Sequence, residues 1–154
     1  MKILAFIRPA KENEALILSE LAEKSEGHWG YDEEYMVKFK EKYRLTEEYI
    51  KNFPVFVLED KEKILGFFGL LFEKDEVNLE FFYIDTDYIG KGYGRMLWSH
   101  LADYCKEKGI KSFTFVTSPE AKGFYIKMGA EYLGEVESSV KKGRIIPRLI
   151  YYVK

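Results

Sequence analysis

The chain has 154 residues, of which 47% are hydrophobic and 17% aromatic, and this composition suits one domain with a single sizeable core. Its 24 basic and 26 acidic residues leave a formal charge of -2, which gives no electrostatic attraction for nucleic acid or an anionic membrane surface. One cysteine cannot form an internal disulfide, and the apolar run at the start is too short for a signal sequence or a membrane span. We therefore expect one domain over residues 1–154, in the cytoplasm.

The first third of the chain predicts one strand and three helical segments. Hydrophobic residues at 3–7 form the strand, which ends at Pro9 because proline fixes its own φ and has no N–H. Apolar positions at helical spacing predict a helix over 13–24, and Asp32 is the expected N-cap of a second helix. A shorter helical turn is predicted over 46–53.

The remainder alternates between strands and helices. Three hydrophobic segments separated by charged turns predict an antiparallel three-strand meander, at 55–58, 64–72 and 77–84. The further predicted elements are a helix at 92–108, a strand at 112–116, a helix at 120–128, and strands at 132–140 and 148–153. A strand–helix–strand unit thus interrupts an antiparallel order. The fold class is α+β, with a central mixed, mostly antiparallel sheet of about six or seven strands flanked by about four helices.

Three alternating glycines lie directly between the strand at 77–84 and the following helix. Gly90, Gly92 and Gly94 let backbone N–H groups converge at a helix N-terminus, where the helix dipole favours an anion such as phosphate. The dinucleotide fingerprint would need glycine at Arg95, and the Gly-Lys-Ser/Thr ending of a P-loop is absent. Taken alone, the spacing fits a tight strand-to-helix turn equally well.

The surrounding sequence resembles the GNAT-type N-acetyltransferases over nearly the whole chain. The resemblance is carried by Ile84–Leu97 (IDTDYIGKGYGRML) and, further along, by Phe124–Ala130 (FYIKMGA). Ile89 stands where the family usually has Arg or Gln, and Thr86 where it usually has Pro. The resemblance implies a GNAT-like fold and acetyl-CoA as cosubstrate, with pyrophosphate held mainly by main-chain N–H groups. The implied cofactor-binding residues are Phe82, Tyr83, Ile84, Ile89, Gly90, Lys91, Gly92, Tyr93, Gly94, Arg95, Ser118 and Tyr125.

The resemblance also implies catalytic roles. Tyr125 would protonate the departing coenzyme A thiolate, and a phenol with a pKa near about 10 is suitably protonated at neutral pH; alternatively it is a core aromatic residue. Ser118 takes the place of an asparagine that contacts the cofactor in many family members. Main-chain N–H groups near 82–84 would polarise the thioester carbonyl.

The strand at 77–84 carries a candidate base for the acceptor amine. Strict alternation places Val77, Leu79, Phe81 and Tyr83 on one face and Asn78, Glu80, Phe82 and Ile84 on the other. Glu80 is then a carboxylate among aromatic residues, where desolvation would raise its pKa and make it a better base. A solvated glutamate on a half-exposed face is the equally weighted alternative.

The Gly27–Tyr31 segment supplies further candidates, because in the family this region borders the acceptor pocket. We expect His28, Trp29 and Tyr31, together with Asn78, to contact the substrate. His28 is a second candidate base, since the unperturbed pKa of histidine is nearest neutrality. Trp29 as a core residue with His28 exposed is as consistent with the sequence. The basic segment at 140–144 is predicted as a hairpin tip.

The leading hypothesis is an N-acetyltransferase that moves acetyl from acetyl-CoA to an amine of a small molecule or peptide by direct attack in a ternary complex. The alternative is a non-catalytic acyl-CoA-binding or sensor domain on the same fold; an unrelated nucleotide-binding domain ranks last. No metal-ligand spacing is present in the sequence, so no metal is expected. No nucleic-acid or membrane partner is expected, and the strand at 149–153 is predicted as a sheet edge able to pair in a homodimer.

Overall fold

A computed structural model describes residues 4–154, in which seven strands form one sheet in the order β1-β2-β3-β4-β5-β7-β6. The strands are β1 (Phe6–Pro9), β2 (Val55–Asp60), β3 (Lys63–Phe72), β4 (Val77–Ile84), β5 (Ser112–Val116), β6 (Glu131–Glu137) and β7 (Ile145–Tyr152). β4 and β5 pair in parallel, and the other neighbouring pairs are antiparallel. This confirms the predicted mixed, mostly antiparallel sheet and its three-strand meander. Ile3, assigned to the first strand from the sequence, lies outside the described residues.

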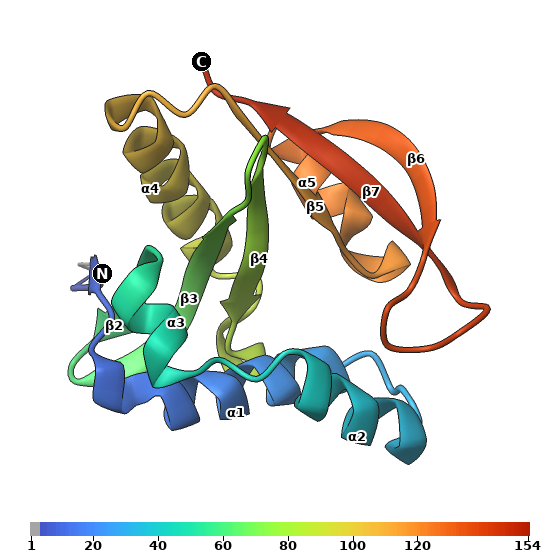
Figure 1. Cartoon of the computed structure of the whole chain (residues 1–154). Helices are drawn as coiled ribbons and strands as arrows, with labels where there is room; N and C mark the ends of the chain where they lie inside the picture. Colours follow the sequence, from blue (N-terminus) through green and yellow to red (C-terminus); the bar gives the residue numbers. More distant parts are fainter. Residues whose placement is uncertain (1–3) are drawn as a thin grey trace.

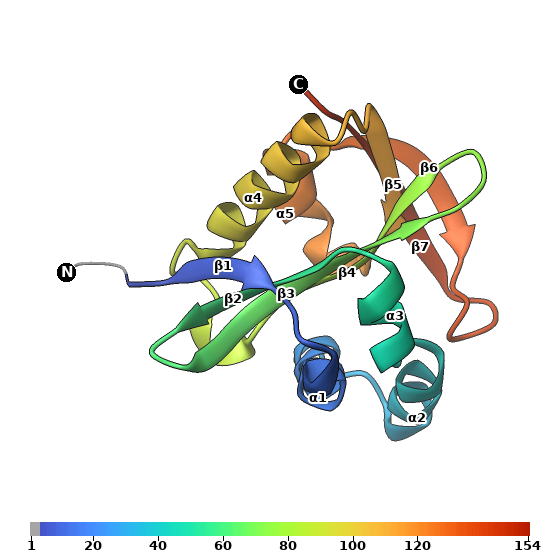
Figure 2. The ribbon, with the colours of Figure 1, turned by 60° about the vertical axis from the view of Figure 1, so that its left-hand side comes forward.

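Helices cover both faces of the sheet. They are α1 (Ala15–Gly27), α2 (Glu33–Lys42), α3 (Glu47–Asn52), α4 (Tyr93–Glu107) and α5 (Lys122–Lys127), with short 3-10 turns η1 (Glu12–Glu14), η2 (Thr86–Tyr88) and η3 (Pro119–Ala121). The first three α-helices lie on one side of the sheet, and α4 and α5 lie on the other (Figure 1, Figure 2). The core is accordingly split into a cluster around Phe68 and Leu97 and a second around Leu18 and Phe67, with a smaller third cluster around Phe39 of α2.

Local capping explains where two of the helices begin. The Asp32 carboxylate accepts a hydrogen bond of 2.7 Å from the Tyr35 N–H, as its prediction as N-cap of α2 requires. The Thr46 hydroxyl accepts one of 3.0 Å from the Tyr49 N–H and starts α3. α1 departs from its predicted bounds: a 3-10 turn precedes it, and the helix continues through Gly27 instead of ending before that glycine. That extension places Ser25 and Glu26 in the last turn of the helix.

A bulge in β4 overturns the strict alternation expected from its sequence. Gly69 of β3 pairs with Phe81 and Leu70 pairs with Leu79, so that Glu80 is the extra residue of the bulge. The two faces therefore exchange at this point. Val77 and Leu79 pack in the same cluster as Phe82 and Ile84, whereas Phe81 and Tyr83 pack in the other. The prediction that placed Leu79 with Phe81 on one face was wrong.

The last strand is not an edge. β7 lies between β5 and β6, and its Leu149 is 0% exposed. β7 also begins earlier than expected, at Ile145, and continues through Pro147, whose carbonyl accepts a hydrogen bond of 3.2 Å from the Thr117 N–H. The sheet edges are β1 and β6. The predicted dimerisation edge at 149–153 is thus excluded as a free edge.

Candidate active site

The parallel strands β4 and β5 separate toward their carboxyl ends and leave an opening in the sheet (Figure 1). Their register pairs Asn78 with Thr114, and the Thr114 hydroxyl donates a hydrogen bond of 2.8 Å to Asn78 Oδ1. Beyond this pair lies a cavity of about 600 Å³. Its walls come from β4, the segment between η2 and α4, the carboxyl end of β5, α5, the end of α1, α2 and the β6–β7 connection. The size is within the range of ligand-binding pockets.

The glycine segment opens onto this cavity at the N-terminus of α4. Gly90 and Gly92 have φ values of +84° and +88°, a left-handed conformation that side chains with a Cβ rarely adopt. Gly92 is the N-cap residue, and its carbonyl accepts the Met96 N–H at 3.2 Å. The N–H groups of Tyr93, Gly94 and Arg95 precede that first intrahelical bond, so the helix supplies them with no acceptor. A phosphate-sized anion fits this arrangement of free donors at a positive helix end.

Gly94 has a different role from the two glycines before it. A Cβ at Gly94 would lie 3.1 and 3.2 Å from ring carbons of Phe124, closer than the packing tolerates without movement. The glycine therefore lets α4 approach α5 at the cavity wall. Ile89, Gly90, Gly92, Gly94 and Arg95 line the cavity, whereas the predicted cofactor residues Lys91 and Tyr93 belong to the segment but not to the lining.

The segment before the glycines is tied to α1 by Lys24. Its ammonium group donates hydrogen bonds of 2.9 Å to Asp85 Oδ1 and to Asp87 Oδ2. Asp85 is buried, and its carboxylate also accepts the Asp87 N–H at 3.0 Å. Burial alone would raise the pKa of Asp85, but the hydrogen bonds from Lys24 and from the Asp87 backbone outweigh it and lower that pKa. Lys24 thus connects α1 with the segment that precedes the glycines.

If acetyl-CoA is the cosubstrate, as the sequence resemblance implies, we expect Lys24→Met to raise its KM by about two- to fivefold with little change in kcat, since exposed ion pairs contribute modestly. Steady-state kinetics at varied acetyl-CoA concentration measures this effect, and Lys24→Arg should restore most of it. Lys38→Met is the matched control, because Lys38 pairs with Glu34 at 3.3 Å on an exposed part of α2. An unchanged KM in Lys24→Met would contradict the positioning role.

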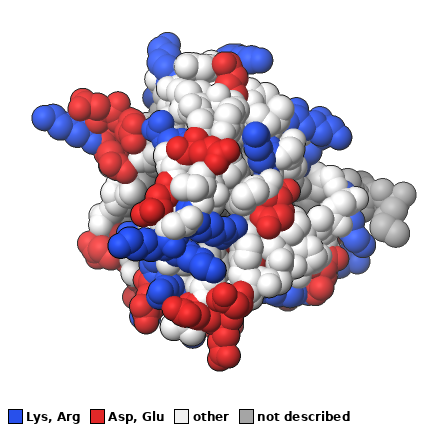
Figure 3. Space-filling model, turned by 90° about the vertical axis from the view of Figure 1, so that its right-hand side faces the viewer, with Lys and Arg blue, Asp and Glu red and all other residues white. Residues whose placement is uncertain are grey.

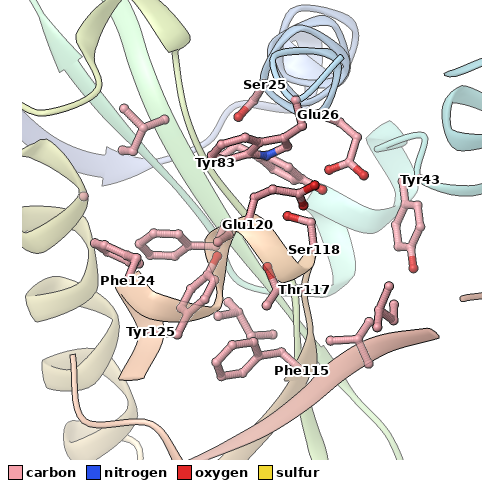
Figure 4. Close-up of a pocket in the computed structure, with 18 of the residues that line it drawn as sticks. Ser25, Glu26, Tyr43, Tyr83, Phe115, Thr117, Ser118, Glu120, Phe124 and Tyr125 are labelled. Atoms are coloured by element: carbon pink, nitrogen blue, oxygen red, sulfur yellow. The ribbon is translucent and has the colours of Figure 1, made fainter. Parts of the chain in front are cut away.

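Tyr125 lies at the inner wall of the cavity. Its ring packs 4.8 Å from Phe115 and 5.7 Å from Trp98, measured between ring centroids. Burial raises the pKa of Tyr125 well above its ordinary value, and an interaction with the Thr117 hydroxyl opposes this in part. The phenol is therefore protonated at neutral pH while its hydroxyl points into the cavity (Figure 4). Phe82, Tyr83, Ile84 and Ser118, predicted to contact the cofactor, line the same cavity.

Glu80 also lines the cavity, from the β4 bulge. Burial raises its pKa, and the charge of Lys42 opposes the increase. Glu80 is half-buried, and the ring of Phe81, the next residue of β4, packs against that of Tyr49 at 5.4 Å. Asn78, predicted as a substrate residue, lines the cavity as well, although its amide group is held by Glu73 and Thr114.

The α1–α2 connection brings only part of its predicted residues to the cavity. Trp29 lines it and is 39% exposed. His28 is exposed and lies outside the lining, with its ring against that of Trp29 at 5.1 Å. Tyr31 also lies outside the lining. Its hydroxyl donates a hydrogen bond of 2.7 Å to Glu120 and accepts one of 2.5 Å from Arg144 Nη2. Burial and the hydrogen bond to Glu120 raise the pKa of Tyr31 to about 12, so it remains a donor.

Several lining residues had not been recognised as site residues in the sequence, among them three that carry a charge or a phenol. These three are Glu26 in the last turn of α1, Tyr35 in α2 and Arg144 in the β6–β7 connection. The Arg144 guanidinium lies 4.2 Å from the ring centre of Tyr31 and 5.0 Å from that of Tyr35. Arg144 belongs to the segment that the sequence marks as a basic hairpin tip, but nothing local to Glu26 separates it from the other glutamates of α1.

Basic and acidic side chains are interspersed on the face of the molecule shown in Figure 3, as expected for the small net charge. Within residues 4–154, no three His, Cys, Asp or Glu side chains come together as metal ligands. Over the same part of the chain, no helix has both the length and the apolar character needed to cross a membrane.

Several solved structures share this fold. An N-acetyltransferase, PaiA, from Thermoplasma acidophilum, solved in complex with coenzyme A, has a TM-score of 0.80 at 18% identity, with 99% of each chain covered. The ribosomal-protein-S18-alanine N-acetyltransferase of Escherichia coli has a TM-score of 0.71 at 14% identity, covering 97% of this chain and 94% of that one. N-acetylglutamate synthase from Neisseria gonorrhoeae, complexed with coenzyme A and N-acetyl-glutamate, has a TM-score of 0.71 at 15% identity, covering 100% of this chain and 36% of that one.

At these identities the likeness establishes the fold alone. No protein of curated function matches the sequence significantly. A sequence model of the acetyltransferase (GNAT) family, however, matches residues 17–130, which span α1 to the end of α5 and include the glycine segment, Glu80 and Tyr125. Together with the fold, that match confirms the family to which the sequence motifs pointed. The chain belongs to the acetyltransferase (GNAT) family.

Proposed function

We propose that the protein transfers acetyl from acetyl-CoA to an amine of a small molecule or peptide, by direct attack in a ternary complex. One observation carries the proposal: the anion-binding N-terminus of α4 and the buried phenol of Tyr125 open onto the same cavity. Family membership makes acetyl-CoA the acetyl donor. On this proposal, residues 1–154 act as one acyl-CoA N-acyltransferase domain.

The chain's own groups suit the donor. The main-chain N–H groups at 93–95 would hold the pyrophosphate, and Gly90 and Gly92 give the backbone the conformation that this requires. Ile89 at the head of the segment is 50% exposed and has no hydrogen-bonding side chain. Pyrophosphate recognition in this protein therefore depends on backbone donors, supported by the positive end of α4.

Bound acetyl-CoA would supply an activated acetyl group as a thioester. Main-chain N–H groups near Phe82 and Ile84, where β4 separates from β5, would polarise its carbonyl. The amine nitrogen forms the new C–N bond as the C–S bond breaks, and Tyr125 donates a proton to the sulfur that leaves with the electron pair. A cavity carboxylate takes the proton of the acceptor ammonium. Glu80 lines the cavity, whereas His28 lies outside the lining, so a carboxylate is favoured over histidine as the base.

The alternative is a non-catalytic acyl-CoA sensor on the same fold. The observation that favours it is Ile89, which replaces the Arg or Gln that is usual at this position in the family. Both functions predict binding of coenzyme A. We expect isothermal titration calorimetry to detect coenzyme A and acetyl-CoA binding at micromolar concentrations. No binding up to millimolar concentrations would contradict both.

Turnover separates the two functions. We expect release of the coenzyme A thiol, followed with a thiol reagent, when acetyl-CoA is combined with at least one member of a panel of monoamines, diamines, amino acids and short peptides. Mass spectrometry of the product should show one added acetyl group on nitrogen. Binding without turnover across the panel would instead support the sensor.

A further inference from the structure

Glu26 is a half-buried carboxylate at the end of α1 that faces the cavity. One of its oxygens, Oε2, accepts a hydrogen bond of 2.7 Å from the Tyr35 hydroxyl, which fixes the direction of the side chain. Within residues 4–154, no lysine or arginine lies within ion-pair distance of this carboxylate. A desolvated carboxylate with this environment is suited to a cation that arrives from the cavity.

Glu26 and Tyr125 come from different elements, and both line the cavity (Figure 4). Burial is the main cause of the raised pKa of Tyr125 and of Tyr83, and the charge of Glu26 adds to both increases. Burial is also the main cause of the raised pKa of Tyr43 and of Tyr49, to which the charge of Glu80 adds in both cases and that of Glu26 in the case of Tyr43. Glu120 also lines the cavity, but it is exposed and its carboxylate accepts a hydrogen bond from Tyr31, whereas Glu26 is half-buried.

The groups around Glu26 have opposing effects on its pKa. Burial raises the pKa of Glu26, the hydrogen bond from Tyr35 and the charge of Arg144 lower it, and the charge of Glu120 raises it. Tyr31 connects the last two groups, because its hydroxyl donates to Glu120 and accepts from Arg144. An ammonium group bound here would be stabilised by Glu26 and would find in the same group a proton acceptor.

We infer that Glu26 binds the ammonium group of the acceptor and takes the proton that this group must lose before it attacks. The inference rests on the proposed N-acetyl transfer and assigns its acceptor-binding residue. The Glu26 carboxylate gains one proton as R–NH₃⁺ becomes R–NH₂. The freed lone pair forms the C–N bond, and the C–S electrons leave on sulfur, which receives a proton from Tyr125. The acylated nitrogen loses its second proton to solvent. Solvent also takes the proton from Glu26 and returns one to Tyr125, so one proton is released overall.

The test uses the full chain and the amine from the panel that gives the fastest thiol release. We expect Glu26→Gln, which keeps the size of the side chain and can still accept from Tyr35, to lower kcat/KM for the amine by about 10²-fold. Glu26→Asp should retain part of the activity because it keeps the charge. Affinity for coenzyme A, measured by calorimetry, should stay within about twofold of wild type in both variants.

A pH profile separates a catalytic role from a structural one. Because the base works when ionised, wild-type kcat/KM should fall as the pH drops through the raised pKa of Glu26, and Glu26→Gln should lack this acid limb. Glu23→Gln is the matched control, since Glu23 lies on the same helix outside the cavity lining and pairs with Lys40 at 4.0 Å. It should show wild-type kinetics.

The outcomes are distinct. A Glu26→Gln variant with wild-type kcat/KM and a retained acid limb overturns the inference while leaving N-acetyl transfer intact. A loss in Glu80→Gln that exceeds the loss in Glu26→Gln assigns the role to Glu80 and overturns it as well. No thiol release with any amine overturns the proposed function, and the inference with it. Thermal unfolding near the wild-type temperature for every variant keeps these comparisons valid.

Discussion

Replacing Tyr125 with phenylalanine is expected to lower kcat by about 10²-fold or more, because the departing thiolate would lose its proton donor. The change removes one oxygen and keeps the ring, which packs against Phe115 and Trp98. Burial raises the pKa of Tyr125, so the phenol should remain a competent donor up to strongly alkaline pH and should not itself produce an alkaline fall in kcat. Initial rates at saturating acetyl-CoA measure the effect, and affinity for coenzyme A should be nearly unchanged.

Tyr151→Phe is the matched control for this prediction. Tyr151 is 8% exposed and packs 5.1 Å from the same Trp98, but it lies outside the cavity lining. It should leave kcat at the wild-type level. If Tyr125→Phe also turned over at the wild-type rate, the hydroxyl would have no part in the mechanism and the tyrosine would be a packing residue.

The glycine segment was predictable because its conformation depends on neighbours in the sequence. A strand, alternating glycines and an amphipathic helix in direct succession place Gly92 at the start of α4, where the structure has it as the N-cap. The roles within the segment were less accessible. The spacing gives no means of knowing that Gly94 is needed for the approach of Phe124, because Phe124 comes from α5.

The faces of β4 could not be derived from β4 alone. The bulge at Glu80 arises in the pairing with β3, where Leu70 moves to Leu79 after Gly69 pairs with Phe81. A single extra residue reverses which side chains share a face, so a period of two fails at that point. The order of the last strands has the same origin. β7 lies inside the sheet because β6 pairs along its outer side, which no property of residues 149–153 reveals.

The acceptor end of the cavity was the least predictable part. Glu26, Tyr35 and Arg144 come from α1, α2 and the β6–β7 connection, and Arg144 reaches Tyr35 only through long-range packing. The sequence instead predicted His28 as a candidate base, because the unperturbed pKa of histidine is nearest neutrality. In the structure, α1 continues through Gly27, and Glu26 in its last turn lines the cavity while His28 is exposed. The extra turn of helix decides which of the two faces the cavity.

Replacing Gly92 with valine is expected to weaken binding of coenzyme A by about tenfold or more. Gly92 has a φ of +88°, which a β-branched residue adopts only with strain, so the backbone should shift at the point where the N–H groups of α4 face the cavity. Loss of even one hydrogen bond to a charged phosphate, worth about 1.5–3 kcal/mol, gives a change of this size. No side chain at Ile89 is available to compensate, since isoleucine donates no hydrogen bond. Calorimetric titration with coenzyme A measures the affinity.

Gly109→Val separates this effect from backbone strain in general. Gly109 follows α4 at its other end, has a φ of +74°, and like Gly92 would place a Cβ in open space. Both variants should lose about 1–2 kcal/mol of folding stability from the left-handed conformation. Only Gly92→Val should lose affinity, because only that end of the helix faces the cavity. Equal affinity in the two variants would mean that the N-terminus of α4 does not hold the pyrophosphate, and would move the donor site elsewhere along the cavity wall.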